Sequence, residues 1–377
     1  MSENLFITYF PLPNMKLDGA FSVAGDRVQD EIRYAISNNF GQTECLVMPV
    51  IRAFPHGKLW LRSLKYDEKT YMGIINFPIV KMASFSAVLF FNLLRSKPKN
   101  IFIWNSYLFQ NISIFIYKTI SRNKPNVIIF VQDVQEPRRI RDIQFFLDMW
   151  SLRIINWFCD LCIPVTKDIL VDFKIKTRSI IAIGGVSESD STEFKTEVKV
   201  GIKDSNYYVM GGALEPYNGT AKIASVWPSC GSAGFLNIYG SGSEASRIEE
   251  ISRKNCYVRF FGKVRREEYL SSAISSLGVI VLRYSEGLDS KYFFPSKFLE
   301  ACNLNVNIIC NKFINFPEQM SPFVNFVSDD LSNLESVLVI SKAIVDSQEL
   351  NLKRIDFVRN NYTWDGVMKS IKMEICR

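Results

Sequence analysis

The chain has 377 residues, of which 47% are hydrophobic and 22% are charged, so it is globular and too long for one ordinary core. Two domains, each of roughly 200 residues or fewer, are therefore expected. The single histidine, His56, excludes metal clusters built from several histidines.

The net charge of +7 is unevenly distributed along the chain. Residues 1–185 carry 23 Lys and Arg against 15 Asp and Glu, or +8, whereas the remaining residues carry 22 against 23, or −1. This excess indicates an anionic partner for the first half, which can be a membrane surface, a nucleic acid or a phosphorylated acceptor. No nucleic-acid-binding motif appears, so no nucleic-acid partner is expected.

The N-terminus has no basic region before its first strand-like run, so we expect no secretory signal and a cytoplasmic location. The apolar run 85–94 is much shorter than the ~20 residues that span a bilayer. Among the eight cysteines, Cys159 and Cys162 form the one close pair, and no second pair accompanies them. We therefore interpret them as buried thiols rather than as a metal or redox site.

Strand-like and helix-like segments alternate in the first half, which predicts a parallel sheet covered by helices. Helices are expected near 26–38, 79–95, 109–120 and 145–159, and a polar linker at 187–204. Strands are expected at 5–10, 44–50, 101–104, 127–131, 162–165 and 180–183.

A second alternating set follows the linker, so the predicted fold class is α/β, with two Rossmann-like doubly wound domains facing a cleft. The expected domains are 1–186 for the acceptor, 205–350 for a nucleotide sugar, and C-terminal helices at 351–377 that can cross back to the first domain. The expected strands are 207–210, 235–239, 258–261, 279–282, 306–309 and 323–327, and the expected helices are 220–226, 244–253, 266–275, 295–302, 331–345 and 364–375.

Residues 284–300 are the most informative segment, because a strand ends in a loop that opens directly into a helix. Pro295 is expected at the first helical position, where its missing N–H costs nothing. Ser296 and Lys297 then lie in the first turn, where free N–H groups and the helix dipole favour phosphate. Glu300 lies on the same helix face as Lys297 and can reach a sugar hydroxyl. The segment predicts a site for the diphosphate and ribose of a nucleotide sugar.

Two glycine-containing loops are expected at the same sheet edge. Gly211 and Gly212 follow the first strand of the second domain, and Gly262, Lys263 and Val264 follow the third. Glycine allows backbone N–H groups to approach an anion closely. Each loop by itself is equally typical of a plain turn, but in register with 295–300 the loops favour a binding site.

The second domain resembles the GT-B glycosyltransferases, in particular the large group that includes bacterial polysaccharide-assembly enzymes. The resemblance covers about 205–330 and rests on Tyr239-Gly-Ser-Gly, Val258-Arg-Phe-Phe-Gly-Lys-Val and Phe294-Pro-Ser-Lys-Phe-Leu-Glu-Ala. It implies that Lys297 contacts the donor phosphate and Glu300 the ribose. It also implies that the loop at Gly262–Val264 meets the base.

The chain departs from that family at several positions. Tyr292 stands where many relatives have a glutamate, the residues from Gly211 to Gly219 lack the usual Arg and Lys, and Gln132 replaces a frequent histidine. The stereochemical outcome is therefore not implied. No Asp-x-Asp triplet occurs, so neither a metal nor another cofactor is expected, and lysines and helix dipoles would stabilise the leaving diphosphate.

Polar residues of the first domain are candidates for the acceptor side. Asp133 follows a predicted strand and is either an acceptor-side base or a helix cap. The three arginines behind it either clamp an acceptor diphosphate or form a solvated basic face. Gly19 shapes a loop that faces the donor or is a plain turn. The acceptor-side set is Gly19, Arg138, Arg139 and Arg141.

The segment 52–65 interleaves basic residues with Phe54, Trp60 and several leucines. This pattern suits the headgroup region of an anionic membrane, where each cation contributes about 1 kcal/mol. An ordinary loop with buried apolar residues is the alternative. The membrane interpretation predicts a peripheral protein at the inner face of the membrane.

Together these patterns predict a metal-independent glycosyltransferase that moves a sugar from a nucleotide-sugar donor to a lipid-linked glycan in surface polysaccharide synthesis, such as O-antigen or capsule. The donor is expected to be UDP-linked, and galactose, galactofuranose, glucose and mannose remain open. Two alternatives also remain: a non-catalytic GT-B partner subunit and a GT-B sugar-nucleotide epimerase.

Overall fold

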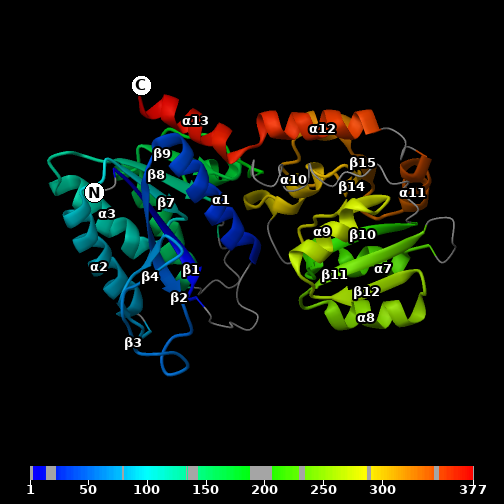
Figure 1. The fold of residues 1–377 in the computed structure, drawn as a ribbon, viewed down its shortest axis with the longest axis horizontal. Coiled ribbons are helices and arrows are strands. Elements are labelled where there is room, and N and C mark those ends of the chain that lie inside the picture. The colour runs from blue at the N-terminus through cyan, green and yellow to red at the C-terminus, as the bar shows by residue number, and fades with distance from the viewer. Residues whose placement is uncertain are drawn as a thin grey trace. The chain divides into compact units, whose positions relative to one another are not determined.

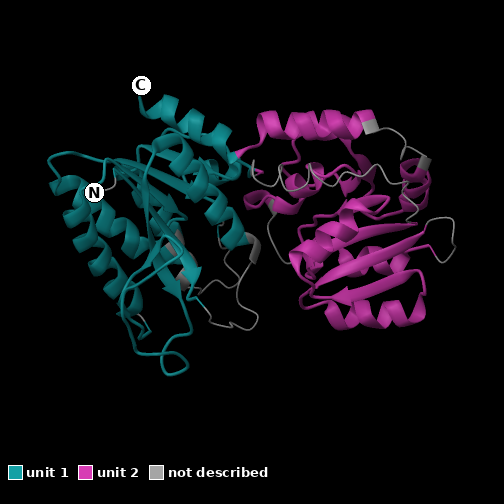
Figure 2. Cartoon of the chain, viewed as in Figure 1, with its two compact units in different colours: residues 1–185, 364–377 teal, residues 186–363 magenta. Residues whose placement is uncertain are grey.

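The computed structural model describes residues 3–13, 23–78, 80–132, 134, 143–186, 206–228, 234–286, 290–343 and 348–376. The chain divides into two compact units (Figure 2). Unit 1 comprises Met1–Gly185 together with Trp364–Arg377, and unit 2 comprises Val186–Thr363. Both ends of the chain thus belong to unit 1. The linker expected at 187–204 lies outside the described residues.

Unit 1 is built on a seven-stranded sheet of order β4-β5-β2-β1-β7-β8-β9, in which only the β4–β5 pair is antiparallel. Its central strands are continuous apolar runs, as expected for parallel strands that are buried on both faces. The short strands β3 and β6 form a separate antiparallel pair. The strands are β1 Asn4–Pro11, β2 Thr43–Val50, β3 Trp60–Leu61, β4 Leu64–Tyr66, β5 Lys69–Tyr71, β6 Ile74–Ile75, β7 Asn100–Trp104, β8 Asn126–Val131 and β9 Leu161–Pro164.

Helices cover both faces of this sheet (Figure 1). One face is covered by α1 together with α13, whose Trp364, Met368 and Ile371 enter the same hydrophobic core as the strands. On the other face α2 lies beside α3 (Figure 1). The helices of unit 1 are α1 Val23–Phe40, α2 Val80–Ser96, α3 Leu108–Ile120, α4 Ile143–Ile154, the 3₁₀ turn η1 Ile155–Trp157, α5 Lys167–Asp172 and α13 Trp364–Ile375.

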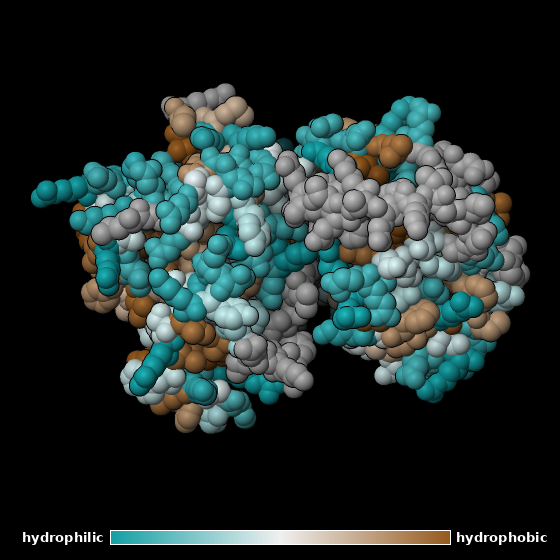
Figure 3. All heavy atoms as spheres, in the orientation of Figure 1, coloured by the Kyte–Doolittle hydropathy of each residue, from teal (hydrophilic) through white to brown (hydrophobic). Residues whose placement is uncertain are grey.

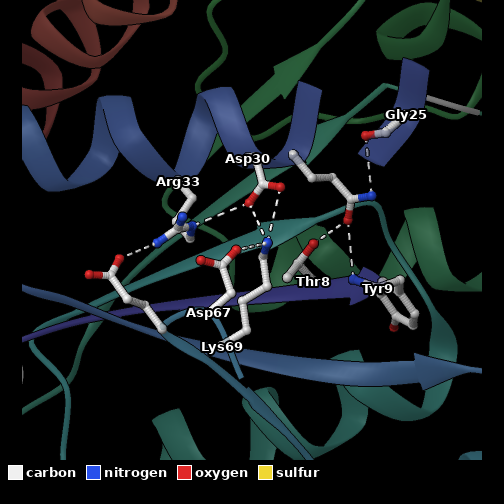
Figure 4. A network of polar contacts seen from close by, with 9 residues as sticks. Thr8, Tyr9, Gly25, Asp30, Arg33, Asp67 and Lys69 are labelled. Carbon is white, nitrogen blue, oxygen red and sulfur yellow. Dashed lines mark hydrogen bonds and ion pairs between the residues drawn. The ribbon is translucent and has the colours of Figure 1, made fainter. Parts of the chain in front are cut away.

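A buried network of charges joins α1 to the edge of the sheet (Figure 4). Lys69 Nζ lies 2.8 Å from Asp30 Oδ1 and 3.3 Å from Asp67 Oδ2. Arg33 Nη1 lies 2.8 Å from Glu68 Oε2. Because both cations are almost fully buried, the nearby carboxylates compensate the loss of their hydration. The network is therefore a structural fastening of unit 1.

Unit 2 contains a six-stranded parallel sheet of order β12-β11-β10-β13-β14-β15. Residues of α7, α8 and α11 share the core on one face, and α9, α10 and α12 lie on the other (Figure 1). The elements are β10 Tyr207–Ala213, η2 Pro216–Asn218, α7 Thr220–Val226, β11 Phe235–Ser241, α8 Ala245–Lys254, β12 Val258–Gly262, α9 Arg266–Ile274, β13 Gly278–Val281, η3 Ser290–Tyr292, α10 Ser296–Cys302, β14 Asn307–Asn311, η4 Glu318–Phe323, β15 Asn325–Val327, α11 Leu334–Ala343 and α12 Gln348–Asn361.

The predicted α/β fold class is confirmed, with two doubly wound parallel sheets, but some elements differ. The strand expected at 180–183 is absent, because this segment forms only an isolated bridge to β9 between Ser179 and Cys162, and Gly184 then has a φ of 137°. Sequence reasoning also missed α5, α12 and the short strands β3–β6. These strands have two to three residues each, too few for an alternating pattern.

The thiols of five described cysteines are buried and free, whereas Cys256 and Cys376 are exposed. Burial raises the pKa of Cys45, Cys159 and Cys302 to about 12. Burial also raises the pKa of Cys162 and Cys310 well above the usual value. The Cys159/Cys162 pair therefore consists of buried thiols, as expected from the sequence.

Within the described ranges, no helix combines the length and the hydrophobicity needed to cross a lipid bilayer.

The packing of α13 generates a stability prediction. Trp364 is 2% exposed and meets the ring of Phe130 edge to face at 6.3 Å. We expect Trp364→Ala to lower the free energy of unfolding of unit 1 by about 3–5 kcal/mol, because it leaves a cavity beneath the last helix. Trp157→Ala, at a side chain that is 69% exposed, is the matched control and should change it by less than about 0.5 kcal/mol. Equal denaturation midpoints for both variants would contradict this packing.

Candidate functional site

The candidate site lies at the carboxyl edge of the sheet of unit 2, beside the central strand β10. Here the strand order reverses, because β11 and β12 extend the sheet on one side of β10 while β13, β14 and β15 extend it on the other. Ligands of doubly wound sheets bind at this switch point, outside the carboxyl ends of the strands. The residues at the ends of β10 and β13 are therefore the first candidates for ligand contact.

Gly211 and Gly212 form the last turns of pairing in β10 rather than a loop, which corrects the expectation that the strand ends at Met210. Parallel pairing with β11 continues to Ala213, opposite Ser241. The two backbones approach so closely that a Cβ atom at Gly240 would lie 1.9 Å from the carbonyl oxygen of Gly212. Gly212 has a φ of 135°, which side chains rarely adopt. Glycine is thus required by the close approach of the strands.

Lys297 extends from α10 onto this glycine pair. A Cβ atom at Gly212 would lie 2.6 Å from Cε and 2.7 Å from Nζ of Lys297, and one at Gly211 would lie 2.4 Å from the ring of Tyr269. The ammonium group lies 5.1 Å from the centre of that ring, within the range of a cation–π contact. The absence of side chains on β10 therefore makes room for Lys297 and Tyr269 at the strand end.

Glu300 lies one turn after Lys297 and is held by α9. Its Oε1 atom is 3.0 Å from Arg266 Nη2, and the two side chains are 17% and 34% exposed. Burial, with a smaller effect of the Glu300 charge, raises the pKa of Tyr269 well above its usual value. Tyr269 is therefore a neutral wall of the site, and Arg266 fixes the orientation of the carboxylate.

The start of α10 differs by one residue from the prediction. The helix begins at Ser296, and Pro295 is its N-cap, with φ −71° and ψ 93°. An extended ψ at Pro295 places its ring just outside the helix, so Ser296 becomes the first helical residue. Ser296 is exposed and Lys297 is partly buried, and both lie in the first turn, as expected.

The other end of α10 is fixed by a buried arginine of α12. Arg354 is 1% exposed and donates hydrogen bonds to the carbonyl oxygens of Cys302, Leu304 and Val306 at 3.0, 2.5 and 2.8 Å. Because these bonds satisfy carbonyls at and beyond the end of the helix, they hold the short α10 in place. Arg354 thereby supports Lys297 and Glu300 from behind.

Gly262, Lys263 and Val264 lie at the same sheet edge, two strands from β10. Gly262 ends β12 with a φ of 68°, and nothing lies within 4 Å of a Cβ atom placed there. Lys263 is exposed and Val264 is partly buried. Strands are about 4.8 Å apart, so this open loop lies roughly 10 Å from the glycine pair of β10.

The remaining predicted residues fall into two groups. Asp133, Gly19, Arg138, Arg139 and Arg141 lie outside the described residues. Tyr292 ends the 3₁₀ turn η3, and His56 is exposed in a turn of unit 1. Among the described residues, no group of three or more His, Cys, Asp or Glu side chains is arranged to hold a metal ion.

Sequence reasoning missed Arg266, Tyr269 and Arg354. Arg266 and Tyr269 are three residues apart on a predicted helix, so their shared face was readable, but no pattern connected it to Glu300. Arg354 lies in a helix that was not predicted as a separate element. These three residues act through contacts between segments that are 34 or more residues apart.

The sequence matches no family model and no curated protein. Solved structures do match its fold, and three of them are described by their overlap. Sucrose-phosphate synthase from Thermosynechococcus elongatus has a TM-score of 0.66 at 10% identity, with 98% of each chain covered. The Anabaena protein HepE, solved in complex with UDP, has a TM-score of 0.64 at 11% identity, with 99% of each chain covered. The lipopolysaccharide outer core galactosyltransferase WaaB has a TM-score of 0.61 at 13% identity, with 99% of each chain covered.

These matches extend over nearly the whole of both chains, so they include both units and not a single shared sheet. Identities of 10–13% establish the architecture alone. The fold expected from the sequence resemblance is thereby confirmed, and this chain has the GT-B fold.

Proposed function

We propose that this protein is a glycosyltransferase that uses a nucleotide-sugar donor. The observation that carries the proposal is the placement of Lys297 against Gly212 at the switch point of unit 2, with Glu300 one turn further along the same helix. A cation next to a strand end without side chains suits a phosphate, and a carboxylate nearby suits a ribose hydroxyl. Both residue types are needed to hold a nucleoside diphosphate.

In this proposal each part of the donor has its own contact. Lys297 and the backbone around Ser296 bind the diphosphate, Glu300 binds the ribose, and the open loop from Gly262 to Val264 meets the base. Arg266 holds the Glu300 carboxylate, and Tyr269 excludes water from one side of Lys297. The weaker screening beside a partly buried wall strengthens the attraction between Lys297 and the phosphate.

The proposed reaction is the attack of an acceptor hydroxyl on the anomeric carbon of the donor sugar. The bond from that carbon to the diphosphate breaks as the new glycosidic bond forms, and the hydroxyl proton passes to a base, for which Asp133 is the candidate. Lys297 neutralises the charge that develops on the leaving diphosphate. A metal ion has no role in this proposal.

The proposed donor is UDP-linked, and the proposed acceptor is a lipid-linked glycan of a surface polysaccharide. Both choices are supported by similar structures: HepE was solved with UDP and with UDP-glucose, and WaaB is described as a lipopolysaccharide galactosyltransferase. Arg138, Arg139 and Arg141 are the proposed contacts of the acceptor, with Gly19 in the facing loop. The sugar is one of galactose, galactofuranose, glucose and mannose.

Association with an anionic membrane surface is the second part of the proposal. Residues 52–66 present Trp60 and Leu64 with exposed fractions of 68% and 45%, and Lys58, Arg62 and Lys65 are exposed among them. Hydrophilic and hydrophobic side chains lie side by side at the end of unit 1 that carries β3 (Figures 1 and 3). Exposed aromatic and basic residues together suit a headgroup region.

The first test of the function is nucleotide binding in the presence of a chelator. We expect UDP to raise the melting temperature more than other nucleoside diphosphates, because a ligand at about 100 times its Kd adds roughly 2.7 kcal/mol to stability. A shift that disappears with the chelator would contradict the metal-free site. A larger shift with GDP would change the donor and keep the site.

The second test separates catalysis from binding. Lys297→Ala and Glu300→Gln should each abolish most sugar transfer while leaving the protein folded, since both side chains are partly exposed. Lys312→Ala and Glu318→Gln are matched controls, because they remove an ion pair of 62% and 65% exposure in the same unit. Parental transfer by the first pair would refute the site, and donor binding without any turnover by the parent would favour the non-catalytic subunit. Interconversion of the donor sugar would favour the epimerase.

The membrane test uses salt. We expect the protein to bind vesicles with anionic lipids at low salt and to leave them at about 0.5 M, where the Debye length is well under ~8 Å. Charge reversal of Lys58, Arg62 and Lys65 to Glu should abolish binding. The same reversal of three exposed cations on α8 should not: Arg247, Arg253 and Lys254. Binding that resists both salt and reversal would disprove an electrostatic anchor.

A further inference from the structure

A second cation stands at the same switch point as Lys297, and the sequence reasoning had not assigned it a role. Arg283 follows β13, the strand that pairs with β10 on the side away from β11. Its Nη1 atom donates a hydrogen bond of 3.0 Å to Asn218 Oδ1. Asn218 in turn donates a hydrogen bond of 2.7 Å to the carbonyl oxygen of Ala213, the last residue of β10. One amide side chain thus links Arg283 to the residue that follows Gly212.

The guanidinium group of Arg283 has no carboxylate partner among the described residues. It lies over the ring of Tyr217 at 4.6 Å, and its Nε atom is buried without a hydrogen-bond partner. Burial lowers the pKa of Arg283, and Tyr217 is the group that opposes this effect. A partly buried charge without a counter-ion is costly, so its retention needs a compensating interaction.

Other buried cations of this protein have the compensation that Arg283 lacks. In unit 1, Lys69 and Arg33 each lie within 3.3 Å of carboxylate oxygens. In unit 2, Arg354 donates to three backbone carbonyl oxygens and to Asn351. Arg283 has one amide oxygen and an aromatic face. The comparison separates cations that hold the fold together from one that is positioned for an external anion.

The backbone of Arg283 is held in place before any ligand arrives. Asn311, at the end of β14, accepts a hydrogen bond from the amide nitrogen of Arg283 and donates one to its carbonyl oxygen, both at 2.8 Å. Asn311 is 1% exposed and also donates to Asp329 Oδ1 at 2.8 Å. Because β13 and β14 together fix this position, little ordering remains to be done when an anion binds.

We infer that Arg283 binds the diphosphate of the nucleotide-sugar donor together with Lys297, one cation on each side of the end of β10. The inference rests on the proposed donor site and adds a binding residue to it. It also explains how the site tolerates a β10–α7 connection, from Gly211 to Gly219, that has no Arg or Lys. The second positive charge comes from the neighbouring strand in place of that connection.

The decisive experiment measures binding and stability of Arg283→Met, which keeps the length of the side chain and removes its charge. Calorimetry with UDP, GDP, uridine and guanosine should show the affinity for the preferred nucleoside diphosphate falling about 10- to 100-fold, the loss of one charge-assisted contact. The affinity for the matching nucleoside should be unchanged. The melting temperature without ligand should stay equal or rise, because an uncompensated buried charge has been removed.

Two further variants complete the test. Arg283→Lys keeps the charge but not the planar fork, so its loss of affinity should be smaller than that of Arg283→Met. Arg259→Met is the matched control, because Arg259 also stacks on a ring, that of Phe235 at 3.6 Å, but lies on the edge strand β12. It should bind the nucleoside diphosphate like the parent.

The outcomes distinguish this inference from the proposed function. If the parent protein binds nucleoside diphosphates and Arg283→Met binds them equally well, the role of Arg283 is refuted and the donor site stands. A fall in melting temperature with equal losses of nucleoside and nucleoside diphosphate affinity would make Arg283 a structural residue and also refute the inference. If the parent binds neither UDP nor GDP, the donor site itself is wrong, and the role of Arg283 is refuted with it.

Discussion

Parallel strand pairing is the constraint on which the rest of this structure depends. A parallel sheet is buried on both faces, so each strand must be followed by a segment that crosses over a face of the sheet. In unit 1 this requirement extends to the end of the chain, because α13 supplies Trp364, Met368 and Ile371 to the core beside α1. Parallel pairing also brings the carboxyl ends of all strands to one edge. Residues as distant in sequence as Gly212 and Arg283 therefore become neighbours of the same strand end.

The edge of the sheet in unit 2 shows how the fold leaves polar groups available. Close approach of β10 and β11 demands glycine at 212 and 240, and the missing side chains are replaced by Lys297 and Tyr269 from the helices above. Arg266 and Arg354 then fix the carboxylate and the helix that carry the chemistry. The site is thus assembled from contacts among β10, α9, α10 and α12, and the chemistry of each side chain is set by its neighbours from other elements.

The elements with strong periodicity or continuous apolar runs were predictable, and so was the position of the site. Both sheets follow from such runs, and the helices at 220–226 and 364–375 coincide with α7 and α13. The failures have physical causes. The segment at 180–183 is apolar but meets β9 at a single bridge, and β4 and β5 are too short for a pattern. Partners such as Arg266 for Glu300, or Asn218 for Arg283, depend on long-range packing that no local pattern encodes.

The buried cysteines described above give each unit its own chemical reporter. A thiol reacts with alkylating reagents only as the exposed thiolate, and burial keeps Cys45, Cys159 and Cys162 of unit 1 and Cys302 and Cys310 of unit 2 protonated and covered. Each of these thiols becomes reactive only when the surrounding unit opens. Cys302 ends α10, directly behind Lys297 and Glu300. Its labelling rate therefore measures how often the helix that carries the proposed donor contacts separates from the sheet, without any probe being introduced into the chain.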